Sequence, residues 1–182
     1  FIRPEPHIVD VTVHAQPIHF GSLFGGGLSR LEELADGLNQ AGIPSAVTDD
    51  IGKDLWAKML YNCPLNALGA ILQVPYGHLG ENENSRALME RIVAEVFQVM
   101  QGMGYSSHWL SAKDYLQDFY GQLLPSTYGH ESSMFQDIRE GRKTEIEALN
   151  GVIVEEGRKL NIDVSCNETV RDQIIFLHDR PS

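Results

Sequence analysis

The sequence predicts a mainly α-helical protein that begins with a short β-hairpin. Beyond about residue 50, apolar residues recur at the spacing of amphipathic helices, and Gly, Pro or Asn separate the candidate helices. An alternation with period two, the pattern of a half-buried strand, marks a stretch near the start. The 182 residues, 42% of them hydrophobic and 21% charged, are enough to build a sizeable core.

Charge and cysteine content exclude several classes of protein. The formal net charge is −11, from 25 acidic against 14 basic residues, which argues against a nucleic-acid partner and against an anionic membrane surface. Cys63 and Cys166 form neither a disulfide framework nor a zinc-ligand pair, and the seven histidines lack a compact metal-ligand spacing. We therefore expect no metal site, and a reducing compartment, the cytoplasm.

The start of the chain predicts two strands. It begins with Phe1 and shows no apolar signal segment, so we expect a piece of a longer protein. Within Ile8–Phe20, three valines alternate with polar residues, and we predict a hairpin whose turn is Gln16-Pro17 and whose second strand is Ile18–Phe20. Two strands alone are marginal in water, so this hairpin needs a larger sheet.

Helices are predicted over most of the remaining sequence. Ser29 is expected to cap a helix whose leucine stripe ends at Gly42, and residues 43–48 are expected to be extended. Thr144 and Glu147 fit a capping box at the start of a later helix. After residue 48, the predicted helices cover residues 50–73, 84–102, 111–124, 130–139, 144–160 and 167–179.

The most informative segment is the predicted helix over Leu55–Leu72, which is apolar almost all round. Lys58, Asn62 and Asn66 are its clearly polar members, and their i, i+4, i+8 spacing places them within about 80° of one helix face. Gly69 lies on the same face. Because a helix that is apolar on all sides is buried, this row carries a lysine and two amides into or beside the interior.

Two interpretations of this polar row remain open at this point. The three side chains would cap loops or line a hydrated seam between domains, where buried polar groups find hydrogen bonds. Alternatively they would line a ligand pocket, in which an ammonium donates a proton, two amides orient a polar substrate and Gly69 leaves room. Pro64 removes one helical N–H, so we also expect a kink in this helix.

A second motif makes a family resemblance specific. Ser132-Ser133-Met134 is followed by Asp137, then by Thr144-Glu145-Ile146-Glu147 and by Asn150-Gly151. Preceded by a Lys-x-x-x-Asn-x-x-x-Asn helix, this arrangement resembles the ketopantoate reductase (2-dehydropantoate 2-reductase) family. The resemblance covers residues 45–178 well and residues 7–45 loosely.

The resemblance implies a fold similar to the C-terminal domain of 6-phosphogluconate dehydrogenase. It implies that residues 49–182 are the helical substrate-binding and catalytic domain. Residues 1–48 would be the tail of an N-terminal dinucleotide-binding (Rossmann) domain. NADPH would be held mainly by the part of that domain that this chain lacks, because the Gly-x-Gly-x-x-Gly fingerprint is absent. We expect the isolated chain to be inactive without it.

By the same resemblance, the reaction is the reduction of ketopantoate to pantoate, on the route to pantothenate and coenzyme A. Lys58 would stabilise and protonate the keto oxygen. Glu145 would hold Lys58 and touch the substrate or the nicotinamide. Asn62 and Asn66 would bind the substrate hydroxyl, and Ser133 would bind its carboxylate. Apart from the resemblance, Glu145 is interpreted as a carboxylate that a helix N-terminus favours.

Other interpretations accompany these assignments. Asp137 is interpreted as structural, paired with Arg139 or Arg142. The family usually has another Asn after the catalytic helix, where the nearest match is Tyr76, and together with Pro64 this leaves another 2-oxo acid open as the substrate. A non-catalytic helical module that forms a homodimer is the alternative from a different class.

Overall fold

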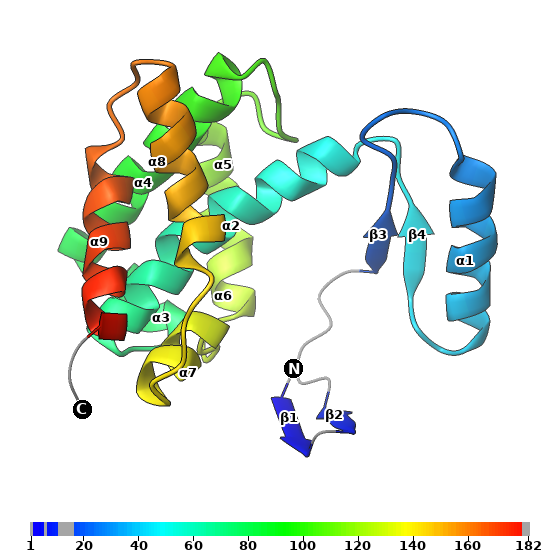
Figure 1. The fold of residues 1–182 in the computed structure, drawn as a ribbon, viewed down its shortest axis with the longest axis horizontal. Helices are drawn as coiled ribbons and strands as arrows, with labels where there is room; N and C mark the ends of the chain where they lie inside the picture. The colour runs from blue at the N-terminus through cyan, green and yellow to red at the C-terminus, as the bar shows by residue number, and fades with distance from the viewer. Residues whose placement is uncertain (1, 6, 11–16, 180–182) are drawn as a thin grey trace. The chain divides into compact units, whose positions relative to one another are not determined.

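The structure is a computed structural model that describes residues 2–5, 7–10 and 17–179, and it divides into two compact units. Phe1–Gly52 holds short strands and one helix, and Lys53–Ser182 holds helices (Figure 1). The expected fold class, mainly helical with a short strand pair at the start, is confirmed. None of the described helices is long and apolar enough to cross a membrane.

The strand pairing of the first unit corrects the position of the expected hairpin. Among the described strands, β3 (Ile18–Phe20) pairs in parallel with β4 (Ser45–Val47) and not with β2. The antiparallel pair is formed by β1 (Ile2–Glu5) and β2 (Ile8–Asp10). Residues 11–16, where part of the hairpin was expected, lie outside the described residues. An alternating pattern predicts a strand but not its partner, because pairing depends on residues distant in sequence.

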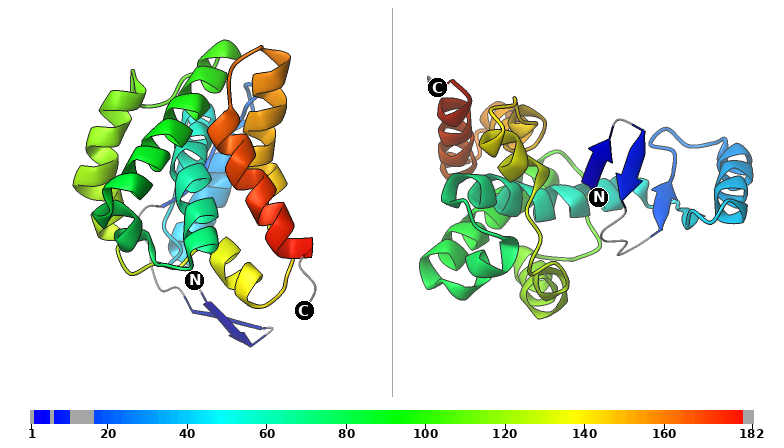
Figure 2. Two further views of the ribbon diagram at one scale, coloured as in Figure 1. Left: turned by 90° about the vertical axis from the view of Figure 1, so that its left-hand side faces the viewer. Right: turned by 90° about the horizontal axis from the view of Figure 1, so that it is seen from below.

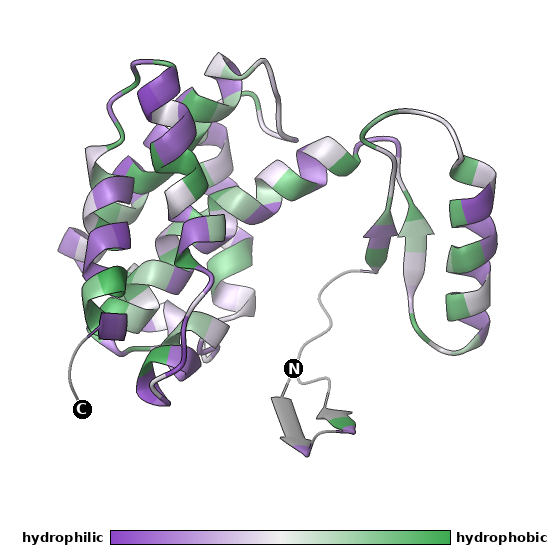
Figure 3. Ribbon diagram, in the orientation of Figure 1, coloured by the Kyte–Doolittle hydropathy of each residue, from purple (hydrophilic) through white to green (hydrophobic). Residues whose placement is uncertain are grey.

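The crossover between β3 and β4 is α1 (Leu28–Gln40), whose apolar side faces β4 (Figure 3). The side-chain amide of Asn39 closes the connection, since it accepts from the backbone N–H of Ser45 and donates to its carbonyl, both at 2.9 Å. The predicted Ser29 cap is wrong. The helix begins at Leu28, two residues earlier than a Ser29 cap implies, and its N-cap Gly27 is in the left-handed conformation without a side-chain cap, because glycine adopts that conformation at little cost.

The second unit is a bundle of helices around the inner half of α2 (Ile51–Leu72) (Figures 1 and 2). This helix runs through Pro64 without a break, and its residues 63–70 are all buried. Its first part is less buried than the apolar sequence predicts. The remaining elements are α3 (Tyr76–Glu81), α4 (Glu83–Gly102), α5 (Ala112–Asp118), a π-helical turn (Phe119–Leu123), α6 (Leu124–Ser126), α7 (Ser133–Arg139), a 3₁₀ turn (Ile146–Ala148), α8 (Asn150–Lys159) and α9 (Ser165–Asp179).

The helix predicted over residues 144–160 is in fact two elements. A 3₁₀ turn ends at Leu149, whose φ of −111° and ψ of −99° are not helical, and α8 follows. The predicted capping box is wrong as well. The Thr144 hydroxyl accepts from the N–H of Ile146, only two residues on, and the Glu147 carboxylate binds Arg171 of α9.

A buried polar network ties four of the helices together. Asn150, the first residue of α8, donates to the carbonyl of Cys63 in α2 at 3.2 Å and to Oδ1 of Asn167 in α9 at 3.0 Å. Asn167 donates in turn to the Glu95 carboxylate of α4 at 2.7 Å. Glu95 also accepts the backbone N–H groups of Cys166 and Asn167, so it caps the first turn of α9. Each helix is therefore held in register by a hydrogen bond to its neighbour.

We expect Glu95→Gln to destabilise the chain by about 2 kcal/mol, because one carboxylate oxygen becomes an NH2 group facing buried N–H donors. Urea denaturation checks this. The control is Glu83→Gln, an exposed acid of the same helix, which is expected to change stability by less than about 0.5 kcal/mol. Equal effects of the two substitutions would show that the carboxylate of Glu95 does not hold α9.

Candidate functional site

The polar row of α2 runs from the protein surface into the interior. Lys58 is exposed, Asn62 is half-buried and Asn66 is 4% exposed. Successive members lie one turn apart on one face, because residues four apart are neighbours on a helix. The row therefore presents a charge at its outer end and amides along its depth.

Tyr76, the first residue of α3, meets the inner end of this row. Its hydroxyl donates to Oδ1 of Asn66 at 2.6 Å, and both side chains are buried. Gly69 lies one turn further along α2, where a Cβ atom would be 3.7 Å from the Tyr76 ring. The Tyr76 ring thus lies against α2 at Gly69.

The start of α7 also packs against Asn66. The Ser132 hydroxyl caps this helix by accepting from the N–H of Phe135 at 3.0 Å, and it lies 3.5 Å from the backbone carbonyl of Asn66. Ser133 is the next residue and is exposed. The two serines therefore differ in role. Ser132 caps α7, whereas the hydroxyl of Ser133 is exposed and has no hydrogen-bond partner among the described residues.

Glu145 belongs to the same neighbourhood. Burial is the main reason that the pKa of Tyr76 lies above its usual value, and the Glu145 carboxylate is among the nearby groups that raise it further. Glu145 itself is exposed and precedes the 3₁₀ turn. Asn66 of α2 thus bonds the Tyr76 hydroxyl directly, and the Glu145 carboxylate is near enough to act on its pKa.

The expected site residues share one property: their polar groups are open. Within the described part of the chain, the side chains of Lys58, Asn62, Ser133 and Glu145 form no hydrogen bond or ion pair, and Nδ2 of Asn66 has no partner. Lys58 and Glu145 are not paired with each other either. A polar group without an internal partner is free to bind a ligand.

Nearby charges of the same motif are paired instead. Asp137 binds Nε of Arg142 at 2.8 Å, as the structural interpretation predicted. Glu147 accepts two hydrogen bonds from Arg171, at 2.7 and 2.8 Å. Of the two acids in Thr144-Glu145-Ile146-Glu147, Glu147 therefore fastens the 3₁₀ turn to α9, and Glu145 keeps an open carboxylate.

Three residues have roles that the sequence does not predict. In the sequence, Tyr76 stands out only as a departure from a family pattern. Asn150 and Gly151 carried part of the motif, yet Asn150 belongs to the buried network and Gly151 leaves room for the Glu147 carboxylate, 2.3 Å from where a Cβ would lie. A signal for Asn150 did exist, because it lies beside the apolar run Val152-Ile153-Val154, and an amide that is buried with such a run needs a partner.

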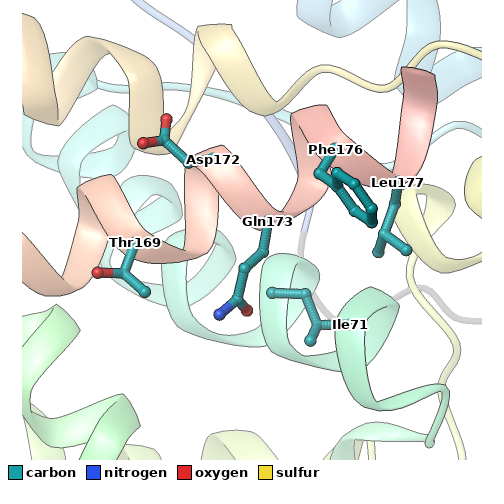
Figure 4. A pocket seen from close by; sticks show the side chains of 6 residues that line it. All are labelled: Ile71, Thr169, Asp172, Gln173, Phe176 and Leu177. Atoms are coloured by element: carbon teal, nitrogen blue, oxygen red, sulfur yellow. The ribbon is translucent and has the colours of Figure 1, made fainter. Parts of the chain in front are cut away.

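A separate surface pocket of about 520 Å³ lies between α2 and α9. Figure 4 shows Ile71 of α2 facing Gln173 and Leu177 of α9, with Asp172 directed away from them. None of the expected site residues lines it. The pocket is therefore distinct from the polar row.

Comparison with known proteins gives one family. The family model described as "Ketopantoate reductase PanE/ApbA C terminal" matches residues 50–177. A 2-dehydropantoate 2-reductase of Aquifex aeolicus is 39% identical over 171 residues, which are 93% of this chain and 55% of that protein. The Archaeoglobus fulgidus protein of the same name is 30% identical over 152 residues, 84% of this chain and 49% of that protein. The chain spans about half the length of these curated relatives.

Solved structures show the same relationship. A PanE/ApbA family ketopantoate reductase from Ralstonia eutropha JMP134 is 30% identical with a TM-score of 0.75, over 91% of this chain and 53% of that one. D-mandelate dehydrogenase, in a ternary structure with NADH and anilino(oxo)acetate, is 26% identical with a TM-score of 0.79, over 88% of this chain and 66% of that one.

The Glu147–Arg171 pair predicts a pH-dependent stability. The hydrogen bond from Arg171 holds the pKa of Glu147 below its usual 4.5, so the pair stabilises the fold fully above that pH. Its contribution is lost as pH falls through the lower native pKa. At pH 7 we expect Glu147→Gln to lose no more than about 1 kcal/mol, because the carboxylate is more than half exposed.

Urea denaturation of Glu147→Gln and of the parent chain at several pH values checks this. The difference between the two is expected to shrink as the pH is lowered from about 5 to about 3. A difference that stays constant over this range would show that the ion pair does not contribute to stability. Arg171→Gln is the matched control, since it is expected to remove the same pH dependence.

Proposed function

The chain belongs to the ketopantoate reductase family, and from this premise we propose that it is the substrate-binding and catalytic half of an NADPH-dependent reductase. The proposed reaction converts 2-dehydropantoate (ketopantoate) to pantoate, in pantothenate and coenzyme A biosynthesis in the cytoplasm. The observation that supports a reaction site is the set of open polar groups around Tyr76 and along α2. The names of the curated relatives support the substrate.

NADPH fits this chain only in part. The crossover β3–α1–β4 is of the kind that dinucleotide-binding folds use. Its loop, Gly21–Gly27, lacks the Gly-x-Gly-x-x-Gly spacing. We therefore assign the nucleotide mainly to a further, N-terminal part of the protein, with Glu145 as a residue here that would contact the nicotinamide. When bound, NADPH supplies a hydride to the keto carbon of the substrate.

Lys58 is the proposed acid. As the keto carbon is reduced, negative charge develops on its oxygen, and an ammonium within hydrogen-bond distance stabilises that charge and delivers a proton. Lys58 suits this role because it is exposed and without an ion-pair partner among the described residues. Glu145 would orient the ammonium in the complex with substrate, when the two open groups approach each other.

The remaining residues would hold the substrate. Asn62 and Asn66 are proposed to bind the hydroxyl of ketopantoate, since amides offer both donors and acceptors. Ser133 would donate to the carboxylate. The polar row along α2 would thus orient the substrate. Its keto oxygen would lie near the exposed end of the row and its hydroxyl near the buried end.

A second candidate is a reductase of another 2-oxo acid. The D-mandelate dehydrogenase structure, which holds NADH and anilino(oxo)acetate, is as similar in fold as the ketopantoate reductase structures. Comparison of kcat/KM for ketopantoate and for an aromatic 2-oxo acid, with NADPH and with NADH, separates the two candidates. Higher kcat/KM for the aromatic acid would replace our proposal by the second one.

We expect Lys58→Met, in the protein that joins this chain to its nucleotide-binding part, to lower kcat for ketopantoate by about a thousandfold. The methionine keeps the length of the side chain and removes its charge and proton. Steady-state kinetics with NADPH measures the effect.

The matched control is Lys113→Met, which makes the same change at an exposed lysine of α5 and is expected to keep the activity of the parent. A Lys58→Met variant as active as the parent would reject Lys58 as the acid. A well-folded parent that reduces no 2-oxo acid would favour the alternative of a non-catalytic helical module that forms a homodimer.

A further inference from the structure

The amide of Asn66 has one end fixed and one end open. Its Oδ1 accepts the hydroxyl of Tyr76 at 2.6 Å. Its Nδ2 has no partner among the described residues. The fully buried side-chain atoms that lack a hydrogen bond there are Oη of Tyr115 and Oδ1 of Asn150, so Nδ2 is not fully buried. Nδ2 is therefore reached by solvent although the residue as a whole is 4% exposed. This side chain therefore presents its NH2 group, a donor, to whatever approaches it.

Tyr76 is held firmly enough to enforce this arrangement. Its backbone N–H donates to the carbonyl of His130 at 3.1 Å, which anchors the start of α3. Its ring meets Tyr61 and His130 edge to face, with centroids 6.0 and 5.2 Å apart. The ring also lies against α2 at Gly69, where an added Cβ would be 3.7 Å from it.

The Tyr76 hydroxyl also remains a donor over the working pH range. Burial raises its pKa above the usual value, and the neighbouring Tyr61 hydroxyl and Glu145 carboxylate act in the same direction. A protonated hydroxyl beside an amide oxygen satisfies that oxygen and leaves the NH2 group facing outward. A tyrosinate, by contrast, would favour the flipped amide.

We propose that Tyr76 is a positioning residue that fixes the Asn66 amide, so that Asn66 presents its NH2 group, a hydrogen-bond donor, to the substrate. This inference rests on the proposed function and makes it more specific. The substrate hydroxyl at this point then accepts from Asn66 and donates elsewhere, and Asn62 is the amide with a free oxygen. Tyr76 therefore contributes to specificity for a hydroxylated 2-oxo acid without touching it.

Tyr76→Phe tests the proposal, because it keeps the ring and removes only the hydroxyl. The substrates are ketopantoate and its analogue without the hydroxyl, 3,3-dimethyl-2-oxobutanoate. We expect kcat/KM for ketopantoate to fall about tenfold, since the amide is free to flip and a hydrogen bond is lost. The kcat/KM for the analogue is expected to change little. The ratio of kcat/KM for ketopantoate to kcat/KM for the analogue therefore falls.

Two further variants make the test selective. Tyr61→Phe is the matched control, because this neighbouring tyrosine bonds Thr127 and not Asn66, and it should leave the preference unchanged. In an Asn66→Ala background, Tyr76→Phe should add no further loss, because a positioning residue acts through its partner. An equal loss with both substrates, or a full additional loss in the Asn66→Ala background, would overturn the proposal.

The unfolding transition separates this inference from the proposed function. If the parent protein does not reduce ketopantoate, the proposed substrate is wrong. The coupling between Tyr76→Phe and Asn66→Ala is then measured from the urea midpoints of the two single variants and the double variant. We expect the urea midpoint of the double variant to shift by less than the sum of the shifts of the two single variants. Strictly additive shifts would show that Tyr76 does not hold Asn66, whatever the substrate is.

Discussion

The buried chain of hydrogen bonds from Cys63 through Asn150 and Asn167 to Glu95 is the constraint on which the helical unit depends. Its members are buried, and a buried polar group that finds a hydrogen-bond partner avoids most of the cost of leaving water. The hydrogen-bonding groups come from four different helices, so the network links the positions of α2, α4, α8 and α9. Apolar burial supplies most of the driving force for the bundle, and this network selects its arrangement.

The candidate site is a consequence of that arrangement. With the inner half of α2 fixed by its neighbours, Asn66 faces α3 and the start of α7, and Tyr76 and Ser132 complete its surroundings. Charges that stabilise the fold are paired at the edges, as in Asp137–Arg142 and Glu147–Arg171. The groups proposed for chemistry are the ones left open. The fold thus pairs these charges and leaves the groups proposed for chemistry available to a ligand.

The sequence predicts most of this fold because most of it is helical. Helical spacing and breakers depend on residues close in the chain, and they place α1, α4 and most of α2 within a few residues of their observed bounds. The pairing of β3 with β4 joins segments separated by a whole helix, so local pattern cannot reveal it. The six-residue α3 was missed because two of its residues are glycines, which disfavour helix.

For the site, the sequence places the polar row on one face of α2 but cannot show which of its groups the protein satisfies. The role of Tyr76 depends on a contact between two helices, so no local pattern encodes it. The most direct test of the account is a structure of the protein with ketopantoate or pantoate bound. We predict the ammonium of Lys58 about 3 Å from the C2 oxygen, with Nδ2 of Asn66 on the ligand hydroxyl and Tyr76 still bonded to Oδ1. A ligand bound in the α2–α9 pocket, or on this face with Lys58 directed away from it, would contradict the account.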